Sequence, residues 1–258
     1  MNTKRAKAVF VGHGSPMNAL GDNPYADGWR DIGKACGPVE AILCVSAHWY
    51  TKETRVAVTD TPKTIHDFYG FPRELYELRY EVPGAPDLAR QVATMLAVDV
   101  KEDAQWGLDH GAWSVLRHMY PAEMGIPVFQ LSIERTLTTR QQYGFGRALA
   151  LLREQGVLII ASGNVVHNLG RIDWNASDGY DWAKRFDKNI HDAILAGRHD
   201  DVLDSLAKDG DAKNAVPTRD HFDPLCYVLG SVDPTEPVAV YNKTCLMGSI
   251  SMTSYVFG

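Results

Sequence analysis

The sequence predicts an α/β fold: a single domain over residues 1–258, with a central, mostly parallel or mixed sheet flanked by helices. Two observations predict this class. Short apolar runs bounded by turn residues recur along the chain, as the buried strands of a parallel sheet do. Segments with apolar residues three to four positions apart lie between these runs, and strands that alternate with helices are typical of the class. No linker, repeat or low-complexity stretch divides the sequence.

Five apolar runs are predicted to be strands. Four of them are rich in Val, Ile and Leu and are expected in the core, and the run at 55–59 is a shorter further strand. The five runs cover residues 7–12, 41–47, 55–59, 127–133 and 157–163. The C-terminal stretch 238–258 alternates in polarity and is rich in β-branched and aromatic residues, so it is predicted to contain two more strands.

Helices are predicted over residues 85–96, 138–156 and 180–197. The first begins with a proline in its first turn, and the other two end at a glycine, as helices commonly do. A further helix is expected shortly after His221. Residues 60–86 contain four prolines and several aromatic residues without regular periodicity. Long irregular segments of this kind are typical of binding loops or covers over a site.

The composition argues against several partners. A net charge of −6 is unfavourable for binding nucleic acid or an anionic membrane. No apolar run reaches the roughly 18 residues that span a bilayer, and the basic N-terminal segment lacks the features of a signal peptide. The four cysteines show no CxxC spacing and are expected to be reduced and mostly buried. We therefore predict a cytoplasmic protein.

Three of the nine histidines follow predicted core strands: His13, His48 and His167. Ligands of open α/β sheets bind outside the carboxyl ends of the strands, so these imidazoles are expected to point into one crevice. Gly12 and Gly14 flank His13 and are expected to allow a tight turn and a close approach of metal and substrate. Scattered neutral imidazoles suit Zn, Fe, Ni or Cu rather than Mg or Ca.

Three other histidines are expected to be structural, because they lie in helical segments among charged neighbours: His118, His191 and His199.

Six motifs in one order carry a family resemblance: GHGSPMNAL (12–20), SAHW (46–49), TIHDFYGFP (64–72), GLDHGAW (107–113), SGNVVHNL (162–169) and DHFDPLCYVLG (220–230). Together they resemble the 4,5-DOPA extradiol dioxygenase family of bacteria and plants. This family belongs to the class III, LigB-like extradiol ring-cleaving dioxygenases. The resemblance implies a dioxygenase that inserts both atoms of O2 into a catechol such as 3,4-dihydroxyphenylalanine. The expected product of 4,5-cleavage is a semialdehyde.

The resemblance also implies roles for individual histidines. His13 and His48 are expected to be metal ligands, and His221 a further ligand. His167 is expected beside the metal, as a ligand or as an acid and base. His110 is expected to bind substrate or transfer a proton, second to His167 in that role. One ion per chain, Zn or Fe(II), is implied, with a small catechol and dioxygen as the partners.

His66, Trp49 and Phe68 are candidates for binding the substrate. Tyr69 and Phe71 are expected to join Trp49 and Phe68 in an aromatic wall against a flat ring, although ordinary loop packing explains these residues equally well.

Two alternatives follow from a departure at His221. The wider class uses two histidines and one carboxylate for Fe(II), but His221 stands where that carboxylate is expected, with Asp220 and Asp223 nearby. An all-histidine site suits Zn. A zinc hydrolase or lyase, with Ser15 and Ser162 as polar helpers, is therefore an alternative. The other alternative is a non-enzymatic, MEMO-like binding protein. The presence of both His110 and His167 favours an enzyme, since binding needs no proton transfer.

Overall fold

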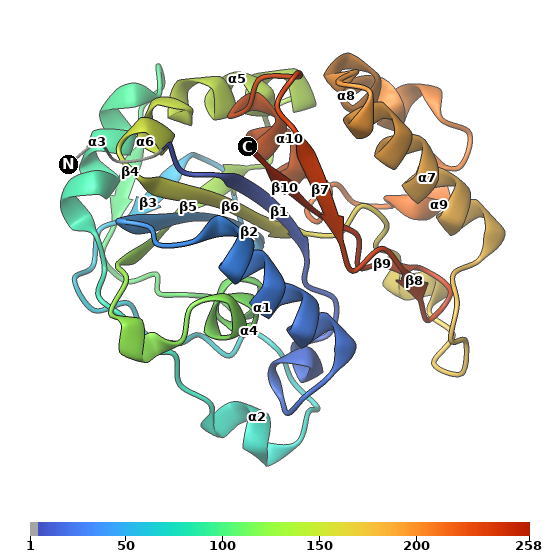
Figure 1. Cartoon of the computed structure of the whole chain (residues 1–258), viewed down its shortest axis with the longest axis horizontal. Helices are drawn as coiled ribbons and strands as arrows, with labels where there is room; N and C mark the ends of the chain where they lie inside the picture. The colour runs from blue at the N-terminus through green and yellow to red at the C-terminus, as the bar shows by residue number, and fades with distance from the viewer. Residues whose placement is uncertain (1–4) are drawn as a thin grey trace.

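Among residues 5–258, which the computed structural model describes, eight strands form one sheet in the order β4-β3-β5-β2-β6-β1-β10-β7 (Figure 1). Residues 1–4, the start of the basic segment in which no signal peptide is expected, lie outside the described residues. The four central strands run parallel to one another: β5 (Val128–Glu134), β2 (Ala41–Thr51), β6 (Val157–Gly163) and β1 (Ala8–Gly12).

The outer strands make the sheet mixed. On one side β3 (Arg55–Ala57) pairs antiparallel with β5 and parallel with β4 (Lys101–Asp103). On the other side β10 (Ser254–Phe257) pairs antiparallel with β1 and with β7 (Val238–Tyr241). The predicted α/β class with a mostly parallel or mixed sheet is therefore confirmed.

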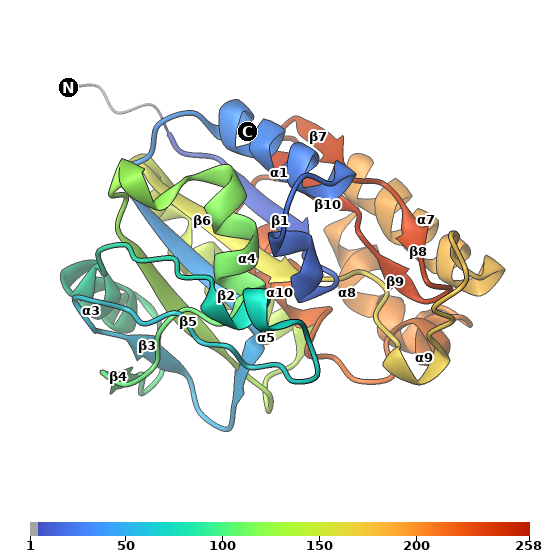
Figure 2. The same cartoon turned by 90° about the horizontal axis from the view of Figure 1, so that it is seen from below.

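Helices cover both faces of the sheet (Figures 1 and 2). One face carries α1 (Pro24–Cys36) and α4 (His110–Met119), whose Trp29 and Trp113 lie in one apolar core. The other face carries α3 (Pro86–Met95), α5 (Thr139–Leu149), α6 (Leu151–Glu154) and α10 (Asp223–Gly230), which enclose a second core. Every residue of β1 and β6 is buried. This explains why these strands are continuously apolar rather than alternating.

A group of helices extends the second core beyond the sheet. It comprises α7 (Asp181–Leu195), α8 (His199–Lys208) and α9 (Ala212–Ala215). The remaining elements are short: α2 (Arg73–Glu77), the strand pair β8 (Cys245–Leu246) and β9 (Ile250–Ser251), and the 3-10 turns Pro16–Ala19, Ala122–Met124 and Leu169–Arg171.

The element predictions hold with several corrections. The predicted helix 138–156 is interrupted at Ala150 and forms α5 and α6. The C-terminal stretch contains four strands instead of two, because left-handed residues at Asn242 and Met247 turn the chain between them. Strand β4 was not predicted. It has the sequence Lys-Glu-Asp and lies at the exposed edge of the sheet, where a strand does not have to be apolar. The segment 60–86 is irregular as predicted, apart from α2 and the first residue of α3.

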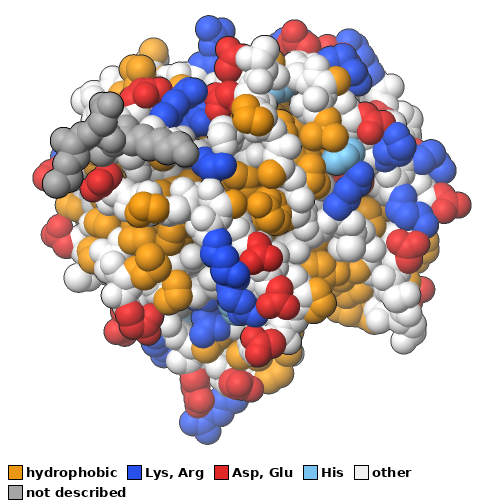
Figure 3. Space-filling model, in the orientation of Figure 1, with side chains coloured by type: hydrophobic (Ala, Val, Ile, Leu, Met, Phe, Trp, Pro, Cys, Tyr) orange, Lys and Arg blue, Asp and Glu red, His pale blue; other side chains and the backbone are white. Residues whose placement is uncertain are grey.

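The surface and the cysteines agree with an ordinary globular domain. On the face shown in Figure 3, acidic and basic side chains stand next to one another around apolar patches. All four cysteines are free, and Cys44, Cys226 and Cys245 are buried, as predicted. Within residues 5–258, no helix combines the length and the apolar character that crossing a membrane requires.

Two paired glycines end the strands that lead to the crevice. Gly12 of β1 pairs with Gly163 of β6. A Cβ at Gly163 would lie 2.1 Å from the carbonyl oxygen of His221, and a Cβ at Gly12 would lie 2.6 Å from the backbone of Met252. Gly14 has φ +58°, which confirms the predicted tight turn. The close approach expected at Gly12 is therefore made by the chain at Met252.

We expect Gly163→Ala to destabilise the fold by about 1–3 kcal/mol, because the added methyl group meets backbone that cannot rotate away. Chemical denaturation measures this change in the free energy of unfolding. Gly144→Ala is the control: its Cβ meets nothing within 4 Å in α5, so it should stabilise the helix by up to about 1 kcal/mol. Equal stabilities for the two variants would contradict the close contact at His221.

Candidate active site

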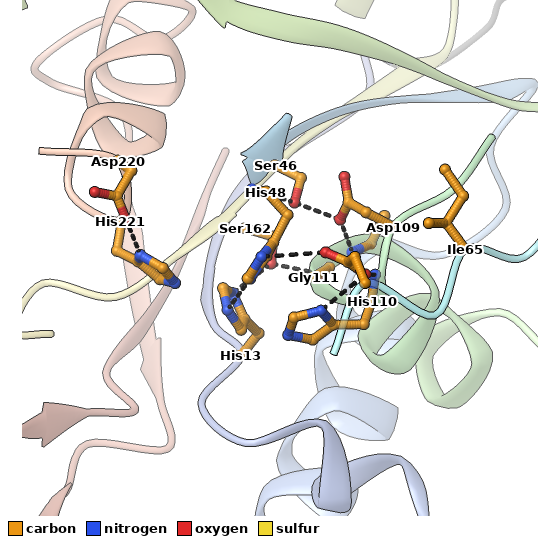
Figure 4. A network of polar contacts seen from close by, with 12 residues as sticks. His13, Ser46, His48, Ile65, Asp109, His110, Gly111, Ser162, Asp220 and His221 are labelled. Carbon is orange, nitrogen blue, oxygen red and sulfur yellow. Dashed lines mark hydrogen bonds and ion pairs between the residues drawn. The ribbon is translucent and has the colours of Figure 1, made fainter. Parts of the chain in front are cut away.

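Five histidines line one cavity of about 440 Å³ at the carboxyl end of the parallel strands. His13 follows β1, and His48 lies in the carboxyl half of β2. His110 is the first residue of α4, His167 follows β6, and His221 precedes α10. The structure thus brings together the three histidines expected at strand ends and also His110 and His221, which the family resemblance implies. Figure 4 shows His13, His48 and His110 close together, with His221 on the opposite side.

The position of His48 differs from the prediction in one respect. Strand β2 does not end before His48 but continues to Thr51. The pairing of β2 with β5 shifts register between Val45 and Tyr50, so His48 lies in the irregular part of the strand. Bulges of this kind commonly redirect a side chain next to a site.

The possible metal-binding side chains form two groups, and within each group the donor atoms lie within 4.8 Å of one another. One group is His13, His48 and His110, and the other is His167, Asp220 and His221. The Nε2 atoms of His13 and His48 are 3.1 Å apart. Two nitrogens that each lie about 2.1 Å from one ion are about 3.0 to 3.4 Å apart, so this pair is spaced as two ligands of one metal. The rings of His167 and His221 stack at 3.5 Å, and those of His13 and His221 are 5.2 Å apart.

The hydrogen bonds of His13 fix its tautomer. Ser162 donates its hydroxyl proton to the carbonyl oxygen of Gly111 at 2.6 Å. The Ser162 oxygen lies 2.9 Å from Nδ1 of His13 and must therefore accept, so the ring proton is on Nδ1. The lone pair of Nε2 is left free toward His48.

Two carboxylates fix the tautomers of three more imidazoles. Asp67 lies 3.3 Å from Nδ1 of His48 and 3.0 Å from Nδ1 of His110, and it also accepts the backbone N–H of His110. Asp220 accepts a short hydrogen bond from Nδ1 of His221. In each case the Nε2 lone pair is free. Carboxylates behind imidazoles in this way are typical of metal ligands, because they orient the ring and raise its basicity.

Behind the cavity, a buried polar network positions β2 against α4. Asp109 caps α4 and accepts hydrogen bonds from Ser46 at 2.6 Å and from Gln130 at 2.9 Å. Burial, together with the nearby charge of Asp67, raises the pKa of Asp109 to about 6. Ser46 lies two residues before His48, and Asp109 directly precedes His110. The network therefore sets the distance between these two histidines.

Burial favours the neutral form of three site histidines: His13, His48 and His167. It lowers the pKa of His13 and of His48 well below the ordinary value, and repulsion among the neighbouring imidazoles lowers both further. Burial, followed by the charge of His221, lowers the pKa of His167 to about 2. Burial alone would raise the pKa of Asp67, but its hydrogen bonds from His110 bring it below the usual value. Neutral imidazoles at pH 7 are the form that binds metal.

The structure does not bring every predicted substrate residue to the cavity. Phe68, Tyr69 and Phe71 line it. Trp49 does not: side chains alternate along β2, so Trp49 points away from His48 and stacks on Trp106 with ring centres 5.1 Å apart. His66 lies behind the wall, with Nε2 on the carbonyl of Leu78 and its ring against Phe68.

Most of the polar residues named with the alternatives already make hydrogen bonds or ion pairs within the fold. Ser162 is held between His13 and Gly111 and offers no free hydroxyl. Ser15 lines the cavity and caps the turn at Pro16–Ala19. Asp223 turns away from the imidazoles and accepts hydrogen bonds from Tyr50 and Gln142, with Arg219 as its ion pair.

The three histidines expected to be structural lie outside the site. His118 contacts the carbonyl of Asn18, and His191 and His199 contact Tyr255 and Tyr143.

Sequence reasoning missed Asp67 and the apolar mouth of the cavity. Asp67 directly follows His66 in the TIHDFYGFP motif, so an acidic residue inside a histidine-containing motif was an available signal. The mouth includes Leu169, Ile172, Trp174, Met247 and Ile250. These residues come from two segments that meet only in the fold, where His167 bridges to Ile250, so no local pattern predicts them.

We expect Asp67→Asn to lower metal affinity by about 10- to 100-fold, because an amide cannot hold both His48 and His110 with Nδ1 protonated. Competition with a chromogenic chelator measures the affinity. Asp103→Asn is a matched control: the Asp103 side chain is 17% exposed against 20% for Asp67, and it pairs with Arg55 on the sheet edge. An unchanged affinity in Asp67→Asn would show that Asp67 does not support the ligands.

The whole-chain comparison defines the class of protein. The profile of the LigB family, described as the catalytic LigB subunit of aromatic ring-opening dioxygenase, matches residues 7–258. The chain belongs to this family, the class III extradiol ring-cleaving dioxygenases. It is an extradiol aromatic ring-opening dioxygenase and therefore an oxidoreductase.

Individual relatives are similar over their full length. The Escherichia coli K12 protein named 4,5-DOPA dioxygenase extradiol is 42% identical over 265 residues, which cover 100% of this chain and 97% of the relative. A Beta vulgaris protein of the same name is 38% identical, over 97% of this chain and 96% of the relative. The crystal structure of an uncharacterized Escherichia coli K12 protein matches with a TM-score of 0.86 at 37% identity, over 98% of this chain and 100% of that one.

Proposed function

We propose that this protein opens the ring of a catechol such as 3,4-dihydroxyphenylalanine beside its two hydroxyl groups, by 4,5-cleavage to a semialdehyde. The observation that carries the proposal is the convergence of five imidazoles on one cavity. In three of them Nδ1 makes a hydrogen bond, and in His48 it lies 3.3 Å from the Asp67 carboxylate, which leaves Nε2 free in all four. The family to which the chain belongs, and relatives named 4,5-DOPA dioxygenase extradiol, support the reaction.

The donor set fits a first-row transition metal. His13, His48 and His110 form a group that could bind a metal ion. We propose one Fe(II) or Zn ion per chain, held by His13, His48 and His221, with His167 beside it. The spacing of His13 and His48 supports this choice, as does the neutral state of the rings. Such an ion would hold both catechol oxygens, lower their pKa and provide a position for dioxygen.

His110 is suited to take a proton from a catechol hydroxyl. Its Nδ1–H faces Asp67, whose negative charge stabilises the imidazolium that forms when Nε2 accepts a proton. His167 has no such carboxylate in direct contact, and burial beside His221 lowers its pKa to about 2. The sequence favoured His167 over His110 for this role. We instead assign proton acceptance to His110, and we place His167 beside the metal.

The aromatic side chains suit a flat substrate. Phe68, Tyr69 and Phe71 form one wall of the cavity, and the edge of Phe68 meets the ring of Phe71 with centres 5.3 Å apart. Phe68 also packs against His110. A catechol lying against this wall would have its hydroxyl groups at the imidazoles.

The test compares two metals in the same protein. Anaerobic reconstitution with Fe(II) should give catechol-dependent oxygen uptake, and reconstitution with Zn should not, because Zn is redox-silent. The proposal fails if the Fe(II) form consumes no oxygen with any catechol while the Zn form hydrolyses an ester or an amide. Binding of catechol without turnover by either form would support the non-enzymatic alternative instead.

We also propose that the protein acts in the cytoplasm. The four free cysteines support a reducing compartment.

A further inference from the structure

The cavity is divided into a polar floor and an apolar mouth. Its floor is formed by the five imidazoles, and its other lining side chains are almost all apolar or aromatic. At the mouth, Tyr69 is 92% exposed, Trp174 is 77% exposed and Leu169 is 65% exposed. Large apolar side chains that remain this exposed around a cavity are typical of a surface that contacts a ligand.

Charged side chains are missing from this lining. None of the sixteen lining residues within the described part of the chain is Lys, Arg, Asp or Glu. The carboxylates nearest the floor are already engaged: Asp67 by His48 and His110, and Asp220 by His221. Arg171 lies in sequence between Leu169 and Ile172 but is not among the lining residues.

The floor fixes how a catechol would lie. Its two hydroxyl groups need the imidazoles, for binding and for proton transfer, so the opposite side of the ring faces the mouth. A substituent on that side therefore contacts Tyr69, Leu169 and Trp174. An apolar substituent gains from leaving water there, whereas a carboxylate loses hydration without finding a cation. An ammonium finds no carboxylate there, only aromatic rings.

We infer that this site selects catechols with an uncharged, apolar substituent over catechols that carry an amino-acid or carboxylate group. This inference rests on the proposed function, since it concerns the substrate of the same site. It makes Leu169, Tyr69 and Trp174 specificity-determining residues. 3,4-Dihydroxyphenylalanine still binds through its ring, but its charged tail contributes nothing.

The test separates binding from turnover. Isothermal titration calorimetry of the Zn-loaded protein, which is redox-silent, compares 4-propylcatechol with 3,4-dihydroxyphenylalanine, since both side chains have three carbons. We expect 4-propylcatechol to bind about tenfold more tightly. Equal or tighter binding of 3,4-dihydroxyphenylalanine overturns the inference, and so does the failure of every catechol to bind. If the binding order holds but the Fe(II) form takes up no oxygen, the proposed reaction fails while the inference about selectivity stands.

A charge placed at the mouth provides a second, independent test. Leu169→Arg should strengthen binding of 3,4-dihydroxyphenylpropionate several-fold, with a gain that shrinks at high salt, and should not strengthen binding of dopamine. Leu151→Arg is the matched control, because Leu151 is also 65% exposed but lies on α6, away from the cavity. Unchanged carboxylate binding in Leu169→Arg overturns the placement of the substituent at the mouth.

Discussion

Replacing His13 or His48 with alanine should leave a protein that no longer retains metal. Their Nε2 atoms lie 3.1 Å apart with both lone pairs free, so each supplies a donor that no neighbour can replace at the same position. We expect metal affinity to fall by more than about 100-fold, beyond the 10- to 100-fold typical for loss of a residue that only supports a ligand. Elemental analysis of the reconstituted, gel-filtered variants measures the bound metal.

His199→Ala is the control for this experiment. His199 is also a buried histidine, 5% exposed against 1% for His13, but it contacts Tyr143 on another part of the molecule. It should keep the full metal content. If both His13→Ala and His48→Ala hold metal as well as His199→Ala does, the proposed metal centre is wrong.

His110→Ala should keep its metal and lose turnover. With His13, His48 and His221 as ligands, removal of His110 leaves the ion in place but removes the imidazole that Asp67 prepares to accept a proton. The loss of a general base is expected to lower kcat by about 10²- to 10⁴-fold. Oxygen uptake and metal content are measured on the same sample, with His110→Gln as a second variant of similar size.

This variant also decides between two ligand sets. The donor atoms of His13, His48 and His110 lie within 4.8 Å of one another, so these three could hold the ion by themselves. In that arrangement His110→Ala would lose metal together with activity, and His221→Ala would keep it. Retained metal in His110→Ala and lost metal in His221→Ala is the result that our ligand set requires.

The sheet could be predicted because burial dictates its sequence. Strands β1 and β6 are covered on both faces and are therefore continuous apolar runs that stand out in the sequence. Strand β4 lies at the exposed edge, where charged residues are favoured, and gives no such signal. The C-terminal turn at Met247 adopts left-handed backbone at a residue other than glycine or asparagine, which residue preferences do not predict.

The site was predictable to the extent that the topology alone determines it. The carboxyl ends of parallel strands lie at one edge of the sheet, so histidines near those ends had to meet, as His13, His48 and His167 do. The errors concern side-chain direction. Trp49 follows His48 directly and was predicted to bind substrate, but alternation along β2 places it on the other side of the strand. Asp67 was missed because its partners His48 and His110 come from distant segments.

The most direct test of the proposed reaction is the stoichiometry of ring opening. Protein reconstituted with Fe(II) under anaerobic conditions is mixed with 4-propylcatechol and oxygen, and the oxygen consumed and the ring-opened product are measured together. We expect one O2 to be consumed for each semialdehyde formed, with no hydrogen peroxide released. No oxygen uptake, release of hydrogen peroxide, or a dicarboxylic acid from cleavage between the hydroxyl groups would contradict it.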